Sequence, residues 1–196
     1  MSWRSTIKTY FTKTILDSVA AGIGRTGISP DTLTVLGFLL SVLAAYLVSQ
    51  GIFVAGGMAL LSSGLFDLLD GAVARARGQA SPRGALLDSS LDRFGEGVLF
   101  FGLLWFYVQE NSPVESLMVY LAFFTSIMVS YLRARSESVG IKGDVGVLTR
   151  GERIIALTAG LLANHVPLAL GIIIILATFT TGQRLIHGLR NARRLE

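Results

Sequence analysis

The stretch that decides the fold is residues 67–92, DLLDGAVARARGQASPRGALLDSSLD, which carries four aspartates between two long apolar runs. A carboxylate at membrane depth costs about 2.5–3.5 kcal/mol on insertion scales, so four together cost about 10 kcal/mol or more. Repulsion between the carboxylates adds to that cost. A membrane protein keeps such a cluster only where cations or a wet cavity compensate it. The sequence therefore predicts a functional site here.

The composition indicates a membrane protein. Of 196 residues, 52% are hydrophobic and 15% are charged, whereas soluble domains carry about 25% charged residues. The mean hydropathy is +0.61. The absence of cysteine excludes a disulfide framework and a thiolate nucleophile. The net charge of +4 comes from basic residues that lie between apolar runs, so we expect membrane lipid and no nucleic acid as a partner.

Residues 1–28 predict an interfacial amphipathic helix followed by a glycine hinge. Apolar side chains recur at every fourth position of a basic segment, at Trp3, Ile7, Phe11, Ile15 and Val19. One apolar stripe on a basic helix is typical of a helix that lies in the membrane interface rather than across it. The alternative is an ordinary packing helix. No continuous apolar run occurs before residue 20, so we expect no cleaved signal peptide.

Six apolar runs predict an all-α integral membrane protein with six transmembrane helices. They cover residues 33–48, 52–77, 82–108, 117–135, 151–163 and 168–181. Ser29-Pro30 and Ser81-Pro82 are helix starts, with a serine cap followed by proline. The spacing of Ser112 and Glu115 predicts a capping box for the fourth helix. We expect one six-span domain over 29–185 and a basic tail over 186–196.

The distribution of charge between the loops predicts the orientation. The turns at 49–51, 109–115 and 164–167 contain no Lys or Arg, and all 17 basic residues lie in the N-terminal segment, the 75–93 region, the 133–153 region and the C-terminal tail. Because cytoplasmic loops carry the excess of Lys and Arg, this places both termini and the aspartate cluster on the cytoplasmic side.

The spacing of the aspartates predicts a cation site. Asp67 and Asp70 are three residues apart and Asp88 and Asp92 are four apart, so each pair shares one helix face. The connecting loop is short, so the two faces can meet. Oxygen ligands without His or Cys favour Mg²⁺ or Mn²⁺ over zinc. Two such ions about 3.5–4 Å apart form the usual clamp on a phosphoryl group.

The residues around the aspartates suggest a site for phosphate. Gly71 leaves room for a ligand to approach the backbone, Ala74 keeps the groove narrow, and Arg75 can contact phosphate through two hydrogen bonds. The N-terminus of the first span, at Pro30, Asp31 and Thr32, and that of the third span, at Ser81, offer unpaired backbone N–H groups to anions.

At this point the sequence carries a resemblance. The pattern D-x2-D-G-x2-A-R-x8-G-x3-D-x3-D is met at Asp67, Asp70, Gly71, Ala74, Arg75, Gly84, Asp88 and Asp92. It resembles the signature of the CDP-alcohol phosphotransferase family, and the six-span layout extends the resemblance to nearly the whole chain. The resemblance implies a homodimeric enzyme of a prokaryotic cell membrane. It implies transfer of a phosphatidyl-type group from a CDP-linked lipid to an alcohol, with release of CMP.

The resemblance also implies roles for individual residues. Two Mg²⁺ ions, which Mn²⁺ can replace, would be held by Asp67, Asp70, Asp88 and Asp92. Asp92 would also take the proton from the attacking hydroxyl. The CDP-lipid would bind at Pro30, Asp31, Thr32, Gly71, Ala74, Arg75, Ser81 and Gly84.

Residues 130–137 and 150–153 resemble the prokaryotic phosphatidylinositol-phosphate synthases and their archaeal-lipid counterparts. This implies inositol phosphate as the acceptor, with its phosphate held by Arg133, Arg153 and Arg193 or Arg194. Guanidinium groups suit a dianionic acceptor because they bind phosphate without competing for the metals. The alternative is that these arginines only orient the protein and anchor headgroups. Glycerol 3-phosphate, a CDP-inositol donor and a diether lipid also remain open.

Two other classes of membrane protein place acids in helices. In a cation or proton transporter, nothing requires Gly71, Ala74 and Arg75 at their spacing, and the chain contains no inverted repeat. Intramembrane prenyltransferases hold two aspartate motifs on widely separated helices, whereas here the motifs are adjacent. Glu96 lies one turn after Asp92 and is expected to extend the polar groove or to pair with Arg93.

Overall fold

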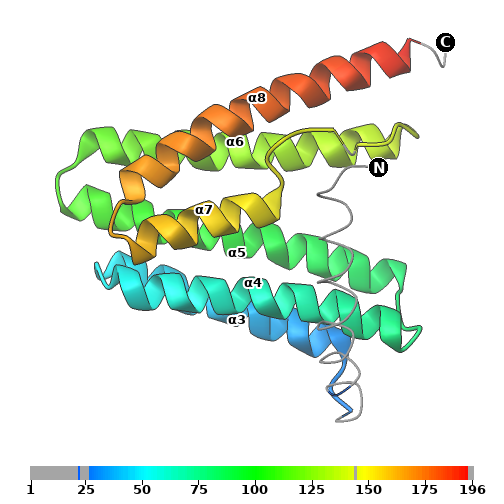
Figure 1. Cartoon of the computed structure of the whole chain (residues 1–196), viewed down its shortest axis with the longest axis horizontal. Coiled ribbons are helices and arrows are strands. Elements are labelled where there is room, and N and C mark those ends of the chain that lie inside the picture. The colour runs from blue at the N-terminus through cyan, green and yellow to red at the C-terminus, as the bar shows by residue number, and fades with distance from the viewer. Residues whose placement is uncertain (1–21, 23–26, 144, 194–196) are drawn as a thin grey trace.

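The computed structural model describes residue 22 and residues 27–143 and 145–193, and in this part of the chain all regular structure is helical. Six helices lie side by side in one bundle (Figure 1). The predicted interfacial helix falls almost wholly outside the described residues. The fold class predicted from the sequence, an all-α membrane protein, agrees with this bundle.

The six helices follow the six predicted apolar runs. Their bounds are α3 Pro30–Ser49, α4 Phe53–Ala76, α5 Pro82–Gln109, α6 Pro113–Ser138, α7 Arg150–Leu162 and α8 Val166–Ala192. The last helix is longer than predicted and continues through the basic segment to Ala192. The basic tail expected from residue 186 therefore begins inside α8, because no proline interrupts the helix there.

Four of the helices, α3, α4, α6 and α8, are long and apolar enough to cross a bilayer. The other two differ from them in length or in charge. α7 has 13 residues, which correspond to about 20 Å. α5 has 28 residues but carries five charged residues between positions 83 and 96, namely Arg83, Asp88, Asp92, Arg93 and Glu96.

The helix starts show which local signals the fold uses. Ser29 and Ser81 cap α3 and α5 by accepting hydrogen bonds from the backbone N–H of Thr32 and Gly84, each at 3.1 Å. The capping box predicted at Ser112 does not form, because that side chain makes no cap hydrogen bond. A capping box forms instead at the start of α7, between Thr149 and Glu152.

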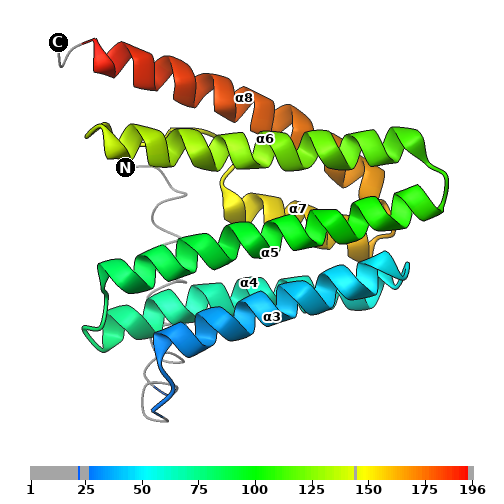
Figure 2. The same ribbon diagram turned by 180° about the vertical axis from the view of Figure 1, so that it is seen from behind.

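The helix contacts close into a ring. α3 packs against α4 and α5, α4 against α7, α5 against α6, and α8 against both α6 and α7 (Figures 1 and 2). Each helix contributes side chains to one buried apolar cluster, among them Val48, Leu60, Leu103, Val119, Leu161 and Ile173. At Gly102 a Cβ would collide with the backbone of Ala45, so glycine permits the close approach of α3 and α5.

This arrangement brings three helix ends together. The C-terminal end of α4 and the N-terminal end of α5 are joined by residues 77–81, where Gly78 adopts a φ of 63°. Both ends lie beside the N-terminus of α3, and Arg150 at the start of α7 contacts Asp67 of α4 and Asp92 of α5, farther along these helices. The polar residues of the chain's central stretch therefore meet at one end of the bundle.

Candidate active site

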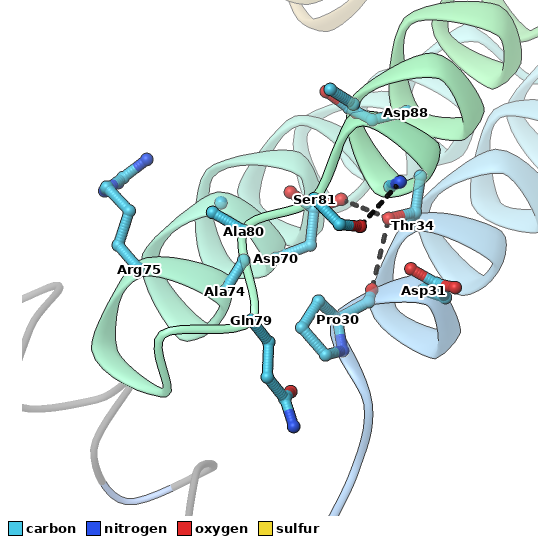
Figure 3. A pocket seen from close by; sticks show the side chains of 13 residues that line it. Pro30, Asp31, Thr34, Asp70, Ala74, Arg75, Gln79, Ala80, Ser81 and Asp88 are labelled. Atoms are coloured by element: carbon cyan, nitrogen blue, oxygen red, sulfur yellow. Dashed lines mark hydrogen bonds between the residues drawn. The ribbon is translucent and has the colours of Figure 1, made fainter.

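A cavity of about 190 Å³ lies between the N-terminus of α3, the C-terminus of α4 and the N-terminus of α5 (Figure 3). It is lined by Pro30, Asp31, Thr34, Asp70, Gly71, Ala74, Arg75, Gln79, Ala80, Ser81, Gly84, Ala85 and Asp88. The cavity therefore combines carboxylates from three helices with small residues and one arginine.

Seven of the eight residues predicted to bind a CDP-lipid line this cavity. The eighth, Thr32, does not. Its side chain is exposed, and its hydroxyl lies 2.8 Å from that of Ser29, which also caps its N–H. The expectation of open N–H groups at these helix starts is therefore wrong for Thr32 and Gly84, because their own cap serines accept those hydrogen bonds.

Arg75 extends from α4 at the rim of the cavity (Figure 3). Its side chain is exposed, and its Nη1 would lie 3.2 Å from a Cβ placed at Gly71. Any side chain at position 71 would therefore crowd both the guanidinium and the cavity. Gly71 keeps this surface open, as the sequence suggested.

Thr34 is a cavity residue that sequence reasoning missed. Its hydroxyl donates a hydrogen bond of 2.7 Å to Oδ2 of the buried Asp70. Figure 3 shows Thr34 between Asp70 and the carbonyl of Pro30. The available signal was its position four residues after Pro30, which places both on one face of α3.

Three of the four aspartates form one group. Asp67, Asp70 and Asp88 each have a carboxylate oxygen within 4.8 Å of the others. Oδ1 of Asp88 is buried and has no hydrogen-bond partner. An unpaired buried carboxylate oxygen is costly, and carboxylate oxygens are the ligands that hard divalent cations prefer. These residues therefore fit a site for Mg²⁺ or Mn²⁺.

Asp92 is not part of that group in this structure. Its Oδ1 lies 2.8 Å from Nη1 of Arg150, and the same nitrogen lies 2.6 Å from Oδ1 of Asp67. Arg93 is farther away, at 3.9 Å from Oδ2 of Asp92. Arg150 is therefore a second site residue that sequence reasoning missed. The signal was present in the RGER segment that opens α7.

Arg153 does not lie where the sequence analysis expected it. It is 1% exposed and makes two hydrogen bonds to Glu96, at 2.7 and 2.9 Å. The guanidinium is thus paired with an internal carboxylate in this structure, and its role in holding acceptor phosphate stays a prediction. Glu96 in turn pairs with Arg153 and not with Arg93. Arg150 and Arg153 lie on the face of α7 that contacts α5, and this face places Arg150 beside Asp92 and Arg153 beside Glu96.

Two other predicted acceptor arginines do not line the cavity. Arg133 is exposed, and its Nε donates to Glu137 at 2.9 Å. Arg193 is exposed at the C-terminal end of α8. Neither Arg133 nor Arg193 is among the residues that line the cavity between α3, α4 and α5, and Arg194 lies outside the described residues.

The loop before α7 is held by α8. The buried Arg184 donates to the carbonyl oxygens of Val145 and Val129, at 2.7 and 2.6 Å. The hydroxyl of Thr180 accepts hydrogen bonds from the N–H groups of Val147 and Leu148. These bonds fix the connection that leads into Arg150, and the sequence analysis had assigned both side chains only to the last span and its tail.

Solved structures resemble this bundle. The phosphatidylinositol phosphate synthase of Mycobacterium tuberculosis with CDP-DAG bound superposes with a TM-score of 0.79 at 33% identity, over 89% of this chain and 93% of that one. The same enzyme in complex with manganese and citrate gives a TM-score of 0.81 at 33% identity, over 89% of each chain.

Known protein sequences also resemble this chain. A phosphatidylinositol phosphate synthase of Mycobacterium marinum is 35% identical over 184 residues, which are 87% of this chain and 78% of that protein. An archaetidylinositol phosphate synthase of Methanothermobacter thermautotrophicus is 37% identical over 169 residues, 83% and 84% of the two chains. Residues 27–183 match the family model of the CDP-alcohol phosphatidyltransferases. The chain therefore belongs to the CDP-alcohol phosphatidyltransferase family and is a membrane-bound transferase of phospholipid synthesis.

Proposed function

We propose that the chain transfers a phosphatidyl-type group from a CDP-linked lipid to inositol phosphate, giving phosphatidylinositol phosphate and CMP. The observation that carries the proposal is the cavity itself, in which the predicted nucleotide-binding residues adjoin three convergent carboxylates. A diphosphate bound there has Arg75 at the rim and the acidic group beneath it. The relatives named phosphatidylinositol phosphate synthase and archaetidylinositol phosphate synthase support this choice of acceptor.

In the proposed reaction the chain's residues position the donor and move one proton. The residues of the predicted set that line the cavity hold the cytidine diphosphate part of the donor. They are Pro30, Asp31, Gly71, Ala74, Arg75, Ser81 and Gly84. The acceptor oxygen forms a bond to the phosphorus that carries the lipid, and Asp92 takes the hydroxyl proton. The bond from that phosphorus to CMP breaks, and CMP leaves with the electron pair. Holding both reactants in this geometry supplies much of the rate enhancement.

Divalent cations belong to this proposal. Asp67, Asp70, Asp88 and Asp92 would together hold two Mg²⁺ ions, which Mn²⁺ can replace. Bound there, the ions offset negative charge on the diphosphate and on the leaving CMP. The structure solved with manganese in a relative supports the choice of ion.

The acceptor's phosphate requires cationic side chains near the cluster. Arg133, Arg193 and Arg194 are the proposed contacts, and the two hydrogen bonds between Arg153 and Glu96 argue against Arg153 as a further one. The alternative role of these three arginines, as orientation charges at the membrane surface, predicts that their removal leaves the KM for the acceptor unchanged.

The proposed setting is a homodimer in a prokaryotic cell membrane. In it all six helices are transmembrane, residues 1–28 lie along the interface, and both termini and the cavity face the cytoplasm. The four long apolar helices and the distribution of Lys and Arg support this arrangement. A cytoplasmic cavity would admit a water-soluble acceptor while the donor's acyl chains stay in the lipid.

The test is release of radiolabelled CMP from CDP-diacylglycerol by the purified protein in lipid nanodiscs. Inositol 1-phosphate, glycerol 3-phosphate, serine and inositol are supplied separately as acceptors. We expect release above the acceptor-free rate with inositol 1-phosphate alone. Release only with glycerol 3-phosphate would identify that compound as the acceptor and overturn the assignment of inositol phosphate.

Two further arms of the assay address the other substrates left open. A diether CDP-lipid in place of the diacyl donor separates the two lipid classes. CDP-inositol supplied with a lipid alcohol tests the reversed assignment of donor and acceptor. CMP release in none of the arms, together with cation uptake into vesicles, would favour the transporter instead.

A further inference from the structure

One nitrogen atom of Arg150 lies between carboxylates of two different helices. Nη1 is 2.6 Å from Oδ1 of Asp67 on α4 and 2.8 Å from Oδ1 of Asp92 on α5. The Arg150 side chain is 18% exposed, and its Nε is buried without a hydrogen-bond partner. A single nitrogen of the charged guanidinium thus lies between two carboxylates, where a bound cation could also lie.

Asp67 belongs to two sets of contacts at once. It belongs to the group of convergent carboxylates with Asp70 and Asp88, and it pairs with Arg150. A carboxylate that ligates a divalent ion binds a neighbouring guanidinium less strongly, because the ion neutralises its charge and repels the guanidinium. Divalent cations and Arg150 therefore compete for the charge of Asp67.

We propose that Arg150 is an internal cation of the metal-free enzyme, which holds Asp67 and Asp92 together and is displaced when divalent cations bind. The inference rests on the proposed function in one respect, namely that the acidic group takes divalent cations. Arg150 is then a positioning residue. It prevents the carboxylates from repelling each other before metal arrives, and it occupies Asp92 until the site is loaded.

The surroundings of Arg150 allow its side chain to leave while α7 stays in place. Arg150 is the first residue of α7, and a Cβ at the following Gly151 would meet no atom within 4 Å. One turn further, the buried pair of Arg153 and Glu96 anchors the helix against α5. The displacement is therefore a rotation of one side chain at a helix end.

The first test measures Mn²⁺ binding to the protein in nanodiscs, without lipid donor or acceptor, by electron paramagnetic resonance. Arg150→Gln removes the competing cation, so we expect about tenfold tighter Mn²⁺ binding, within the usual range of coupling between two ligands. Arg150→Lys keeps the charge and should bind Mn²⁺ with an affinity closer to wild type. Lys142→Gln removes one positive charge from an exposed loop residue and is the matched control.

The second test uses the wild-type chain and does not depend on a variant that folds. Phenylglyoxal labels accessible arginines, and mass spectrometry reports each site. We expect labelling of Arg150 to increase when Mn²⁺ is added, because the guanidinium leaves the two carboxylates. Arg190, which is exposed, should be labelled in both states, and the buried Arg153 in neither.

The outcomes separate this inference from the proposed function. If wild-type protein does not bind Mn²⁺, the proposed cation site fails. If it binds Mn²⁺ but Arg150→Gln binds it equally or more weakly, only the role of Arg150 fails. Labelling of Arg150 that stays constant or falls on addition of Mn²⁺ would likewise overturn the displacement.

Discussion

The four aspartates of the site are chemically distinct, although they lie on two neighbouring helices. Asp70 is buried and accepts a hydrogen bond from Thr34, so it is held in one orientation. Asp88 has a buried oxygen with no partner. Asp92 is paired with Arg150. The four carboxylates therefore differ in their surroundings, although the motif treats them alike.

Asp92→Asn should abolish turnover while leaving CDP-lipid binding intact. The amide cannot accept the hydroxyl proton, and loss of a general base lowers the rate by about 10²–10⁴-fold. CMP release measures turnover, and titration with CDP-diacylglycerol measures binding. Full activity in this variant would remove the proton-transfer role from Asp92.

Thr34→Val should destabilise the protein in buffer containing EDTA. The change keeps the shape of the side chain but leaves Oδ2 of the buried Asp70 without its donor, which costs about 1–3 kcal/mol. Thr34→Ser keeps the hydroxyl and is the control. Thermal unfolding in detergent measures both variants, and equal melting temperatures for the two would contradict the importance of this hydrogen bond.

At the residue scale, short spacings were readable from the sequence and long-range partners were not. The three- and four-residue intervals between the aspartates predict shared helix faces, and the small residues between them predict a ligand cavity. The partners of Arg150 and Arg153 lie on other helices, and Glu96 is 57 positions from Arg153. Nothing local to α7 says which of its two arginines faces Asp92 and which lies deeper against Glu96.

At the scale of elements, α5 and α7 are joined by two matched ion pairs. Asp92 and Glu96 are one turn apart on α5, and Arg150 and Arg153 are about one turn apart on α7. The outer pair, Arg150 with Asp92, is partly exposed. The side chains of the inner pair, Arg153 and Glu96, are 1% and 8% exposed. The inner pair therefore fixes the register of α7 and carries the larger energetic consequence.

Glu96→Gln should lower the free energy of unfolding by about 3–5 kcal/mol, because it leaves the buried Arg153 without a compensating charge. Chemical unfolding in detergent micelles measures the loss. The double change Glu96→Leu with Arg153→Met replaces both charges by apolar groups, and it should cost less than the single change.

Glu137→Gln provides the matched control for that experiment. It breaks the exposed pair with Arg133, in which both side chains are 49% exposed, and such surface pairs contribute about 0–1 kcal/mol.

If Arg153 held acceptor phosphate instead, Arg153→Met would raise the KM for the acceptor without loss of stability.

Helix starts were predictable where serine and proline act locally. Ser29 and Ser81 cap α3 and α5 as the sequence indicated. The same reasoning failed at Ser112, because its backbone has a ψ of 80° and its side chain makes no cap bond. It also passed over Thr149, where the capping box does form. A local pattern shows where a cap is possible, and the approach angle of the chain decides whether it forms.

At the scale of the whole molecule, the proposed orientation can be tested because the natural chain contains no cysteine. Gln50→Cys and Lys142→Cys place single thiols at exposed positions in two different connections. With a membrane-impermeant maleimide on intact spheroplasts, we expect labelling at position 50, and labelling at position 142 only after permeabilisation. The reverse pattern would invert the topology and contradict a cytoplasmic cavity.

Hydropathy predicted the number of helices in the bundle, but it did not predict which helices pack against one another. Six apolar runs predict six helices, and all six are present. The order of contacts around the ring depends on close approaches such as that between Gly102 and Ala45. It also depends on Arg184, which ties α8 to the loop before α7. These contacts join distant parts of the chain, so no periodicity within one segment reports them.

The shortness of α7 has a consequence for where the two substrates meet. At about 20 Å it is roughly 10 Å shorter than the hydrocarbon core of a bilayer. In the proposed orientation, with the C-terminal end of α7 at the outer boundary, its first residue, Arg150, would lie below the inner surface of the membrane. The barrier would then be thinner at this point than in the surrounding bilayer. A water-soluble acceptor could reach the cavity there while the lipid stays in its leaflet.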